Sequence, residues 1–301
     1  MNPARRRSLA MLARLAAASG WLGVHAAALR AQSMKPLERT GGPYVPTPWS
    51  VVDQMIRMAE IGPKDLVMDL GSGDGRLVIA AAQRHGARGY GVDIDPELIK
   101  LATANAQKEG VAPRVRFEQR DIFDTDVREA TVLTLYLLPA MMTRLRPKMM
   151  SELRAGSRIV AHDYPFDEWR PDSQITFDVP EKVAITGIAA STVYLWIVPA
   201  RLEGRWQISA PVASGFDRAE VMLRQTFQDL TGTLVVDKRA AQRLDATSLR
   251  GQDFRFAVPV EGRAGRSGRA IFRGRIEGGR IEGTIESTLA GDVRFRASPL
   301  L

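Results

Sequence analysis

The sequence contains no cysteine among its 301 residues. This absence excludes disulfide bonds, thiolate metal sites and cysteine nucleophiles, and it leaves the redox compartment open. Histidine is scarce as well, because only His25, His85 and His162 are present. Three scattered imidazoles are too few for a histidine metal site, so we expect no metal.

A clustered basic region is also missing from the middle of the chain, although the formal net charge is +8. Residues 1–31 carry five arginines and no acid, and residues 201–301 hold 17 basic and 12 acidic side chains. A net charge of −2 is left for residues 32–200, where the chemistry is expected. Non-specific nucleic-acid binding needs a clustered basic face, so no nucleic-acid partner is expected.

Residues 1–31 have the layout of a secretory signal: a charged start, an Ala/Leu-rich stretch and small residues at the end. Arg6 and Arg7, followed by Ser8, Leu9 and Ala10, resemble a twin-arginine export signal. The alternative is an amphipathic N-terminal helix. The apolar run is too short to span a bilayer permanently, so we expect no permanent membrane span after signal cleavage. We therefore expect an exported, periplasmic protein, or a cytoplasmic one if this segment is not cleaved.

The length favours two domains after the signal. In residues 32–202, apolar runs alternate with helical patterns near 75–86, 96–110 and 139–153. This alternation predicts a Rossmann-like α/β sheet with helices on both faces, ending in a hairpin with one antiparallel strand. Residues 203–301 show short alternating strands, which predict a small all-β barrel or sandwich of unknown role, with a tight hairpin at Gly278-Gly279.

The most informative segment is the glycine-rich loop in "LVMDLGSGDGRLVIA", residues 66–80. Asp69 ends the first predicted strand, and Gly71 and Gly73 permit a close backbone approach before a helix. A dinucleotide loop wants G-x-G-x-x-G/A, whereas here Gly75 comes one residue early and Asp74 would repel a pyrophosphate. S-adenosylmethionine carries a sulfonium, an ammonium and a ribose diol, which suit carboxylates. The loop therefore predicts an S-adenosylmethionine site.

Two further strand ends support this cofactor. Asp93, in "GVDIDP", is placed to accept both ribose hydroxyls, and "RDIFD" places Asp121 and Ile122 where an adenine edge and face would lie. In the correct order on one strand–helix frame, these weak signals combine into a strong one. Together with the loop, they give the predicted cofactor-binding residues Asp69, Gly71, Ser72, Gly73, Asp93, Asp121 and Ile122.

The segments "VMDLGSGDGR", "GVDIDP", "RDIFD" and "VLTLYLLP" resemble those of class I methyltransferases. More closely, "YVPTPWSVVDQMI", "LYLLPAMMTRLRPKM" and "RIVAHDYPFDEW" resemble the seven-β-strand lysine methyltransferases of the ATP-synthase c-subunit type. The resemblance covers roughly residues 42–200. It implies that Tyr44 and Thr47 close over the cofactor and that residues 136–139 line the methyl-transfer channel, with Tyr136 as the candidate catalytic residue.

The implied activity is N-methylation of a protein lysine or of another amine, including a small-molecule acceptor. The alternative is an exported binding or scaffold protein without turnover, because S-adenosylmethionine is made inside the cell. A third interpretation, an NAD-dependent oxidoreductase, is disfavoured by the loop spacing. His162 and Asp163, after the fifth strand, favour a hydrogen-bonded strand terminus, with a base or acceptor-binding pair as the alternative.

Overall fold

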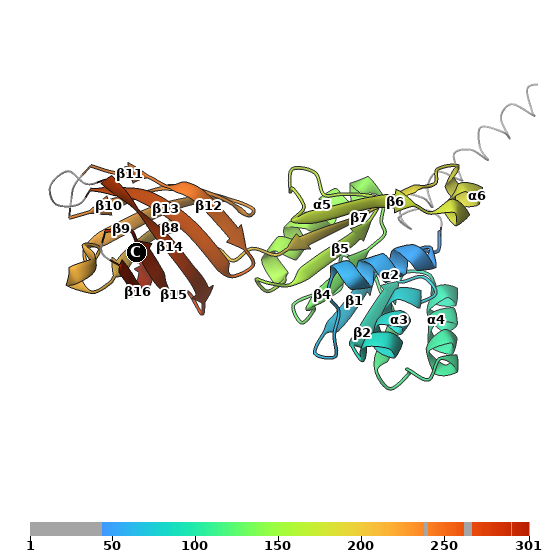
Figure 1. Cartoon of the computed structure of the whole chain (residues 1–301). Helices are drawn as coiled ribbons and strands as arrows, with labels where there is room; N and C mark the ends of the chain where they lie inside the picture. The colour runs from blue at the N-terminus through green and yellow to red at the C-terminus, as the bar shows by residue number, and fades with distance from the viewer. Residues whose placement is uncertain (1–43, 238–239, 262–266, 290, 301) are drawn as a thin grey trace, which may run out of the picture. The chain divides into compact units, whose positions relative to one another are not determined.

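The computed structural model describes residues 44–237, 240–261, 267–289 and 291–300 (Figure 1). The predicted signal, residues 1–31, lies outside the described residues. The first sheet has seven strands in the order β3-β2-β1-β4-β5-β7-β6. Its strands are β1 (Leu66–Leu70), β2 (Arg88–Asp93), β3 (Val115–Gln119), β4 (Val132–Leu135), β5 (Arg158–His162), β6 (Ser173–Asp178) and β7 (Ala190–Ile197).

The strand directions confirm the predicted sheet. β1 to β5 run parallel to one another, whereas β7 is antiparallel to both of its neighbours, β5 and β6. Between β6 and β7 lie a 3-10 turn, η1 (Pro180–Lys182), and a one-turn helix, α6 (Val183–Thr186), which no sequence pattern indicated. The chain therefore ends this sheet with the expected antiparallel pair, joined by a longer connection than a plain hairpin.

Helices cover both faces of the sheet, because alternate strand residues point to opposite sides. On one face, α2 (Trp49–Met58) and α3 (Arg76–His85) pack against Val67 and Val132, and α4 (Pro96–Lys108) adjoins α3. On the other face, α5 (Pro139–Glu152) packs against Leu133 and Leu135. This is the α/β architecture that the alternating sequence pattern predicts.

The second sheet is antiparallel throughout, in the order β11-β10-β9-β8-β16-β15-β14-β13-β12. It almost closes, because Leu244 N donates to Gly232 O at 3.0 Å and Thr247 Oγ1 donates to Leu230 O at 2.7 Å. A core of buried side chains fills it, with Phe256 stacked on Phe272 at 4.7 Å between ring centroids. Its strands are β8 (Gly204–Ser209), β9 (Ala219–Thr226), β10 (Asp229–Val236), β11 (Gln242–Arg243), β12 (Asp245–Arg250), β13 (Asp253–Glu261), β14 (Ser267–Glu277), β15 (Arg280–Ser287) and β16 (Gly291–Pro299).

Two turns of this sheet differ in how well the sequence predicts them. The expected hairpin at Gly278-Gly279 is confirmed, with both glycines at positive φ and Glu277 paired with Arg280. Residues 219–236 also form a hairpin, in which the chain turns back at Phe227, whose φ is +52°. This turn contains no glycine or asparagine, the residues that usually occupy such a backbone conformation, so residue type alone does not predict it.

Candidate functional site

The glycine loop follows β1 at the carboxyl edge of the first sheet. Its three glycines, Gly71, Gly73 and Gly75, have φ values of +85°, +53° and +79°, in the region that favours glycine. The backbone N–H groups of Gly71 and Ser72 donate to Val92 O at 2.8 and 2.9 Å. These bonds hold the loop against the end of β2.

Close packing also disfavours a side chain at two of these glycines. A Cβ on Gly71 would lie 3.1 Å from Leu137 Cδ2, and a Cβ on Gly75 would lie 2.6 Å from the Phe117 ring. The Gly71 contact brings the loop directly against the residues that follow β4. The loop and the segment predicted to line the methyl-transfer channel are therefore neighbours.

The carboxylate of Asp93 lies where the sequence predicts it, at the end of β2 and next to the loop. Its Oδ2 accepts a hydrogen bond from Gly73 N at 3.0 Å, and its Oδ1 accepts one from Asp95 N at 3.0 Å. Each carboxylate oxygen has a second lone pair for a ligand. These two backbone bonds fix the orientation of the side chain.

Asp69 is buried at the end of β1, and its Oδ1 accepts a hydrogen bond from Thr134 Oγ1 at 2.8 Å. Burial raises the pKa of the Asp69 carboxyl to about 7; the charges of Asp93 and Asp74 add to the rise, and the Thr134 bond opposes it. A nearby cation would favour the ionised form. Thr134 is a site residue that sequence reasoning missed, although a single polar residue inside an apolar strand was a usable signal.

Asp74 is not the unbalanced negative charge that the sequence suggests. Its carboxylate pairs with Arg76, with Nη2 to Oδ2 at 2.6 Å and Nε to Oδ1 at 2.9 Å. The charge of Asp74 is thus balanced by its neighbour, so the expected repulsion of a pyrophosphate is much reduced. The spacing of the glycines is what still disfavours a dinucleotide.

Arg76 also connects the loop to the segment before α2, because its Nη1 donates to Thr47 O at 2.8 Å. Thr47 is therefore beside the start of α3, as a residue near the cofactor must be. Tyr44 precedes Pro46 and belongs to a separate N-terminal unit, so its closing role stays a prediction. The residue is 45% exposed.

After β3, the two residues predicted for adenine have different environments. Asp121 is exposed, and its Oδ1 accepts a hydrogen bond from Phe123 N at 2.8 Å. Ile122 is buried in the same core cluster as Val92 and Leu137, the residues that contact the glycine loop. The role of both residues stays a prediction.

Tyr136 follows β4 and is half-buried. Its ring centroid lies 4.0 Å from that of His162 and 6.3 Å from that of Tyr164. Burial, with smaller contributions from Asp163 and Tyr164, raises the pKa of Tyr136 to about 12, so the phenol stays protonated near neutral pH. The ends of β4 and β5 thus present aromatic rings.

Ser72 Oγ is buried, and it has no hydrogen-bond partner among the described residues. A buried hydroxyl without a partner is uncommon and indicates a missing one. The described part of the chain holds no group of three or more acidic or histidine side chains arranged for a metal ion. Within residues 44–300, apart from the undescribed gaps, no helix is long and apolar enough to cross a membrane.

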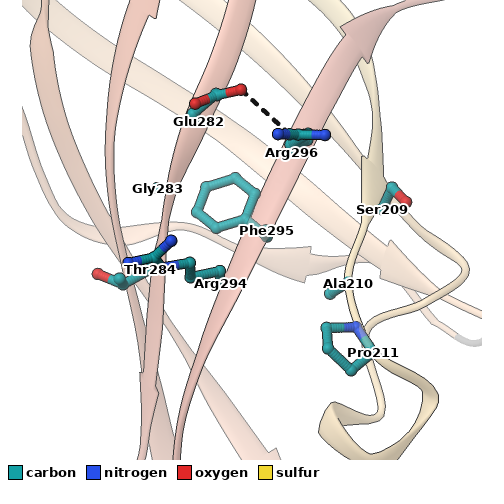
Figure 2. Close-up of a pocket in the computed structure, with 9 residues that line it drawn as sticks. All are labelled: Ser209, Ala210, Pro211, Glu282, Gly283, Thr284, Arg294, Phe295 and Arg296. Carbon is teal, nitrogen blue, oxygen red and sulfur yellow. Dashed lines mark ion pairs between the residues drawn. The ribbon is translucent and has the colours of Figure 1, made fainter.

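A hollow of about 570 Å³ lies on the second sheet (Figure 2). Figure 2 shows Phe295 in its wall and the ion pair of Arg296 with Glu282. Arg296 Nε lies 3.0 Å from Glu282 Oε1. None of its lining residues is a predicted site residue. The hollow is therefore lined by residues of the β-rich region alone.

Comparison with known proteins identifies the family. The model of the ANTKMT methyltransferase domain matches residues 69–173. A protein-lysine N-methyltransferase of Saccharolobus islandicus is 38% identical over 157 residues, covering 52% of this chain and 93% of the relative. The lysine N-methyltransferase of the ATP synthase c-subunit from Xenopus laevis is 34% identical, covering 43% of this chain and 57% of the relative.

Among solved structures, an RNA methyltransferase of Salinibacter ruber in complex with S-adenosyl-L-homocysteine is 46% identical. The match covers 52% of this chain and 96% of that one, with a TM-score of 0.48. The two curated relatives are both named as lysine N-methyltransferases. The chain belongs to the class I, seven-β-strand S-adenosylmethionine-dependent methyltransferases, in the group that includes the ATP synthase c-subunit lysine methyltransferases.

Proposed function

We propose that this chain transfers a methyl group from S-adenosylmethionine to the ε-amine of a protein lysine. The observation that carries the proposal is the contact between the glycine loop and the end of β4, at Gly71 and Leu137. This contact supports the proposal because it joins Gly71, a predicted cofactor residue, to residues 136–139, the predicted lining of the methyl-transfer channel, which we call the acceptor wall. The Saccharolobus relative, a protein-lysine N-methyltransferase, supports the acceptor class.

The residues around the loop fit this cofactor. Asp69 and Asp93 are carboxylates suited to its positive groups and its ribose hydroxyls. Ser72 Oγ, which has no partner among the described residues, can bond a polar ligand atom. Asp121 and Ile122 are proposed for the adenine, and Tyr44 and Thr47 for closing the site. When bound, the cofactor supplies a methyl group activated by its sulfonium.

On the acceptor side, the chain must favour a neutral amine, because an ammonium has no lone pair for the attack. Tyr136, Leu137 and Leu138 offer a mainly apolar wall, which disfavours the ammonium form of an entering lysine. Positioning the amine in line with the methyl group is the remaining task. The methylammonium product then releases a proton to water.

The acceptor can be identified by incubating the full chain with methyl-labelled S-adenosylmethionine and an extract from cells that lack the protein. The expected result is label on protein, with N-methyl-lysine located by mass spectrometry. Asp93→Ala should abolish it, whereas Asp53→Ala should not, because Asp53 pairs with Arg84 in an exposed ion pair on α2.

Other results of the same experiment would reject the proposal. Label in nuclease-sensitive material would make RNA the acceptor. Cofactor binding without any transfer would favour the binding or scaffold alternative.

We further propose that residues 1–31 direct export, on the strength of the sequence pattern alone. Cleavage would leave residues 32–202 as the methyltransferase domain and residues 203–301 as a β-rich domain. An exported enzyme would need S-adenosylmethionine outside the cytoplasm, so the location of the protein bears directly on turnover.

A further inference from the structure

A buried polar cluster lies beside Tyr136, and neither the cofactor nor the acceptor wall accounts for it. Lys182, at the end of η1, donates from Nζ to Asp163 Oδ2 at 2.5 Å, to Ser191 Oγ at 3.0 Å and to Ala190 O at 2.8 Å. Its side chain is only 7% exposed. A lysine is almost never fully buried unless it is paired, and these three acceptors are the partners that allow Lys182 to be buried.

The cluster holds the end of β5 in an unusual backbone conformation. Asp163 has a φ of +62°, which is uncommon for a residue other than glycine. Its Oδ1 accepts a hydrogen bond from Thr192 N at 3.0 Å, and its own N–H donates to Thr192 O at 2.7 Å. With Lys182 on Oδ2, both carboxylate oxygens are bonded, so the surrounding contacts dictate this conformation.

His162 is the residue that the cluster fixes next to Tyr136. Its side chain is fully buried, and its Nε2 lies 3.1 Å from Ser191 Oγ and 3.4 Å from Asp163 Oδ2. Nδ1 has no hydrogen-bond partner in the described part of the chain. The predicted hydrogen-bonded strand terminus at His162-Asp163 is thereby confirmed, and one ring face remains for Tyr136.

The charges that face His162 come from few groups: Asp163 on its own strand end and Lys182 from η1, with the phenols of Tyr136 and Tyr164 nearby. The pKa of His162 is lowered to about 4, mainly by burial; the charge of Asp163 opposes this shift and the charge of Lys182 adds to it. The imidazole is therefore neutral at ordinary pH. Lys182 and Asp163 cancel each other's charge, so this group of side chains around His162 and Tyr136 carries no net charge.

A neutral wall suits the proposed reaction. The lone pair of the amine nitrogen forms a bond to the methyl carbon while the carbon–sulfur bond breaks. The electron pair of the broken bond goes to sulfur. The positive charge passes from sulfur to nitrogen, and the methylammonium then releases a proton to water. An imidazolium at this place would repel that charge throughout, whereas the faces of neutral aromatic rings attract it.

We propose that Lys182 is a positioning residue of the methyl-transfer site, which acts through Asp163 and Ser191 to hold the neutral His162 ring against Tyr136. The inference rests on the proposed amine methylation, and it adds the residue that orients the acceptor wall. Lys182 itself does not touch the reacting atoms in this role.

The direct test is the titration of His162 in the full chain, followed by NMR of the imidazole nitrogens. Only three histidines are present, so His25→Asn and His85→Asn identify the remaining signal. In the wild type we expect one neutral tautomer down to about pH 5. In Lys182→Met the midpoint should rise by about one pH unit or more, because Asp163 would act unopposed. Lys182→Arg should keep the wild-type curve.

A Lys182→Met curve that overlays the wild type would overturn the proposal. If that variant does not fold, as judged by its thermal unfolding, Ser191→Ala provides the test. It keeps the ion pair and removes the hydroxyl at Nε2, and we expect the single tautomer to be lost. An unchanged tautomer in Ser191→Ala would then contradict the proposal.

A second readout uses methyl transfer to poly-L-lysine as the amine probe. We expect kcat in Lys182→Met to fall about tenfold or more, with the Kd for S-adenosylmethionine unchanged and activity restored in Lys182→Arg. An unchanged kcat would refute the role in catalysis. If the wild type binds the cofactor and methylates no poly-L-lysine, the proposed function fails for this acceptor, and the NMR result still decides whether Lys182 holds His162.

Discussion

At the residue scale, Asp69 gives the site a pH dependence whose sign can be stated. Its pKa of about 7 in the free protein means that the folded chain holds a proton there between about pH 4 and pH 7. This group's contribution to stability therefore falls as the pH rises through that range. A bound cation needs the carboxylate, so binding must displace the proton below pH 7.

We therefore predict that the affinity for S-adenosylmethionine increases as the pH rises from about 6 to about 7, by up to about tenfold per unit, and then levels off. Calorimetric titrations in buffers of different ionisation enthalpy would measure both the Kd and the released proton. Asp69→Asn should bind more weakly and without this pH dependence. A wild-type Kd that stays constant over this range would show that Asp69 does not interact with the charge of the cofactor.

At the element scale, the turn from β1 to α3 depends on glycine at position 71. Gly71→Ala would put a Cβ at positive φ and 3.1 Å from Leu137 Cδ2. We predict a loss of about 1–2 kcal/mol in the free energy of unfolding, together with weaker cofactor binding because the loop or Leu137 must move. Gly62→Ala is the control, because its Cβ would meet none of the described residues within 4 Å. Equal stability of the two variants in urea would argue against this account.

The hairpin of β14 and β15 allows a similar test away from the site. Gly278 and Gly279 both have positive φ, as a two-residue type I′ turn requires, and Asn-Gly is a preferred pair for it. We predict that Gly278→Asn keeps the free energy of unfolding and that Gly279→Ala lowers it by about 1 kcal/mol. Urea denaturation of both variants, with S-adenosylmethionine binding unchanged, would confirm this. The opposite order of stabilities would contradict it.

Periodicity and turn chemistry predicted much of the structure, and contacts between distant segments were not predictable. The helix α3, expected near residues 75–86, and the turn at Gly278-Gly279 follow from spacing and residue type. The bond from Thr134 to Asp69 depends on the register of two strands 65 residues apart, which no local pattern fixes. The same holds for Lys182 and Asp163, which η1 and β7 bring together.

At the scale of the whole molecule, the positive charge lies mainly in the first 31 and the last 101 residues, on either side of a slightly acidic methyltransferase region. We predict that the protein isolated from its own host lacks about its first 28–31 residues, because small residues there fit a cleavage site. Intact mass measurement of the isolated protein would decide this. A full-length mass would contradict export by cleavage and favour a cytoplasmic enzyme.

The central claim, that the loop after β1 is a working S-adenosylmethionine site, is tested most directly by calorimetric titration of the full chain with S-adenosylmethionine and S-adenosylhomocysteine. We predict micromolar binding of both ligands, retained in Asp53→Ala and lost in Asp93→Ala, whose carboxylate is bonded to the loop at Gly73. No binding of either ligand by the wild type, or undiminished binding by Asp93→Ala, would contradict the account.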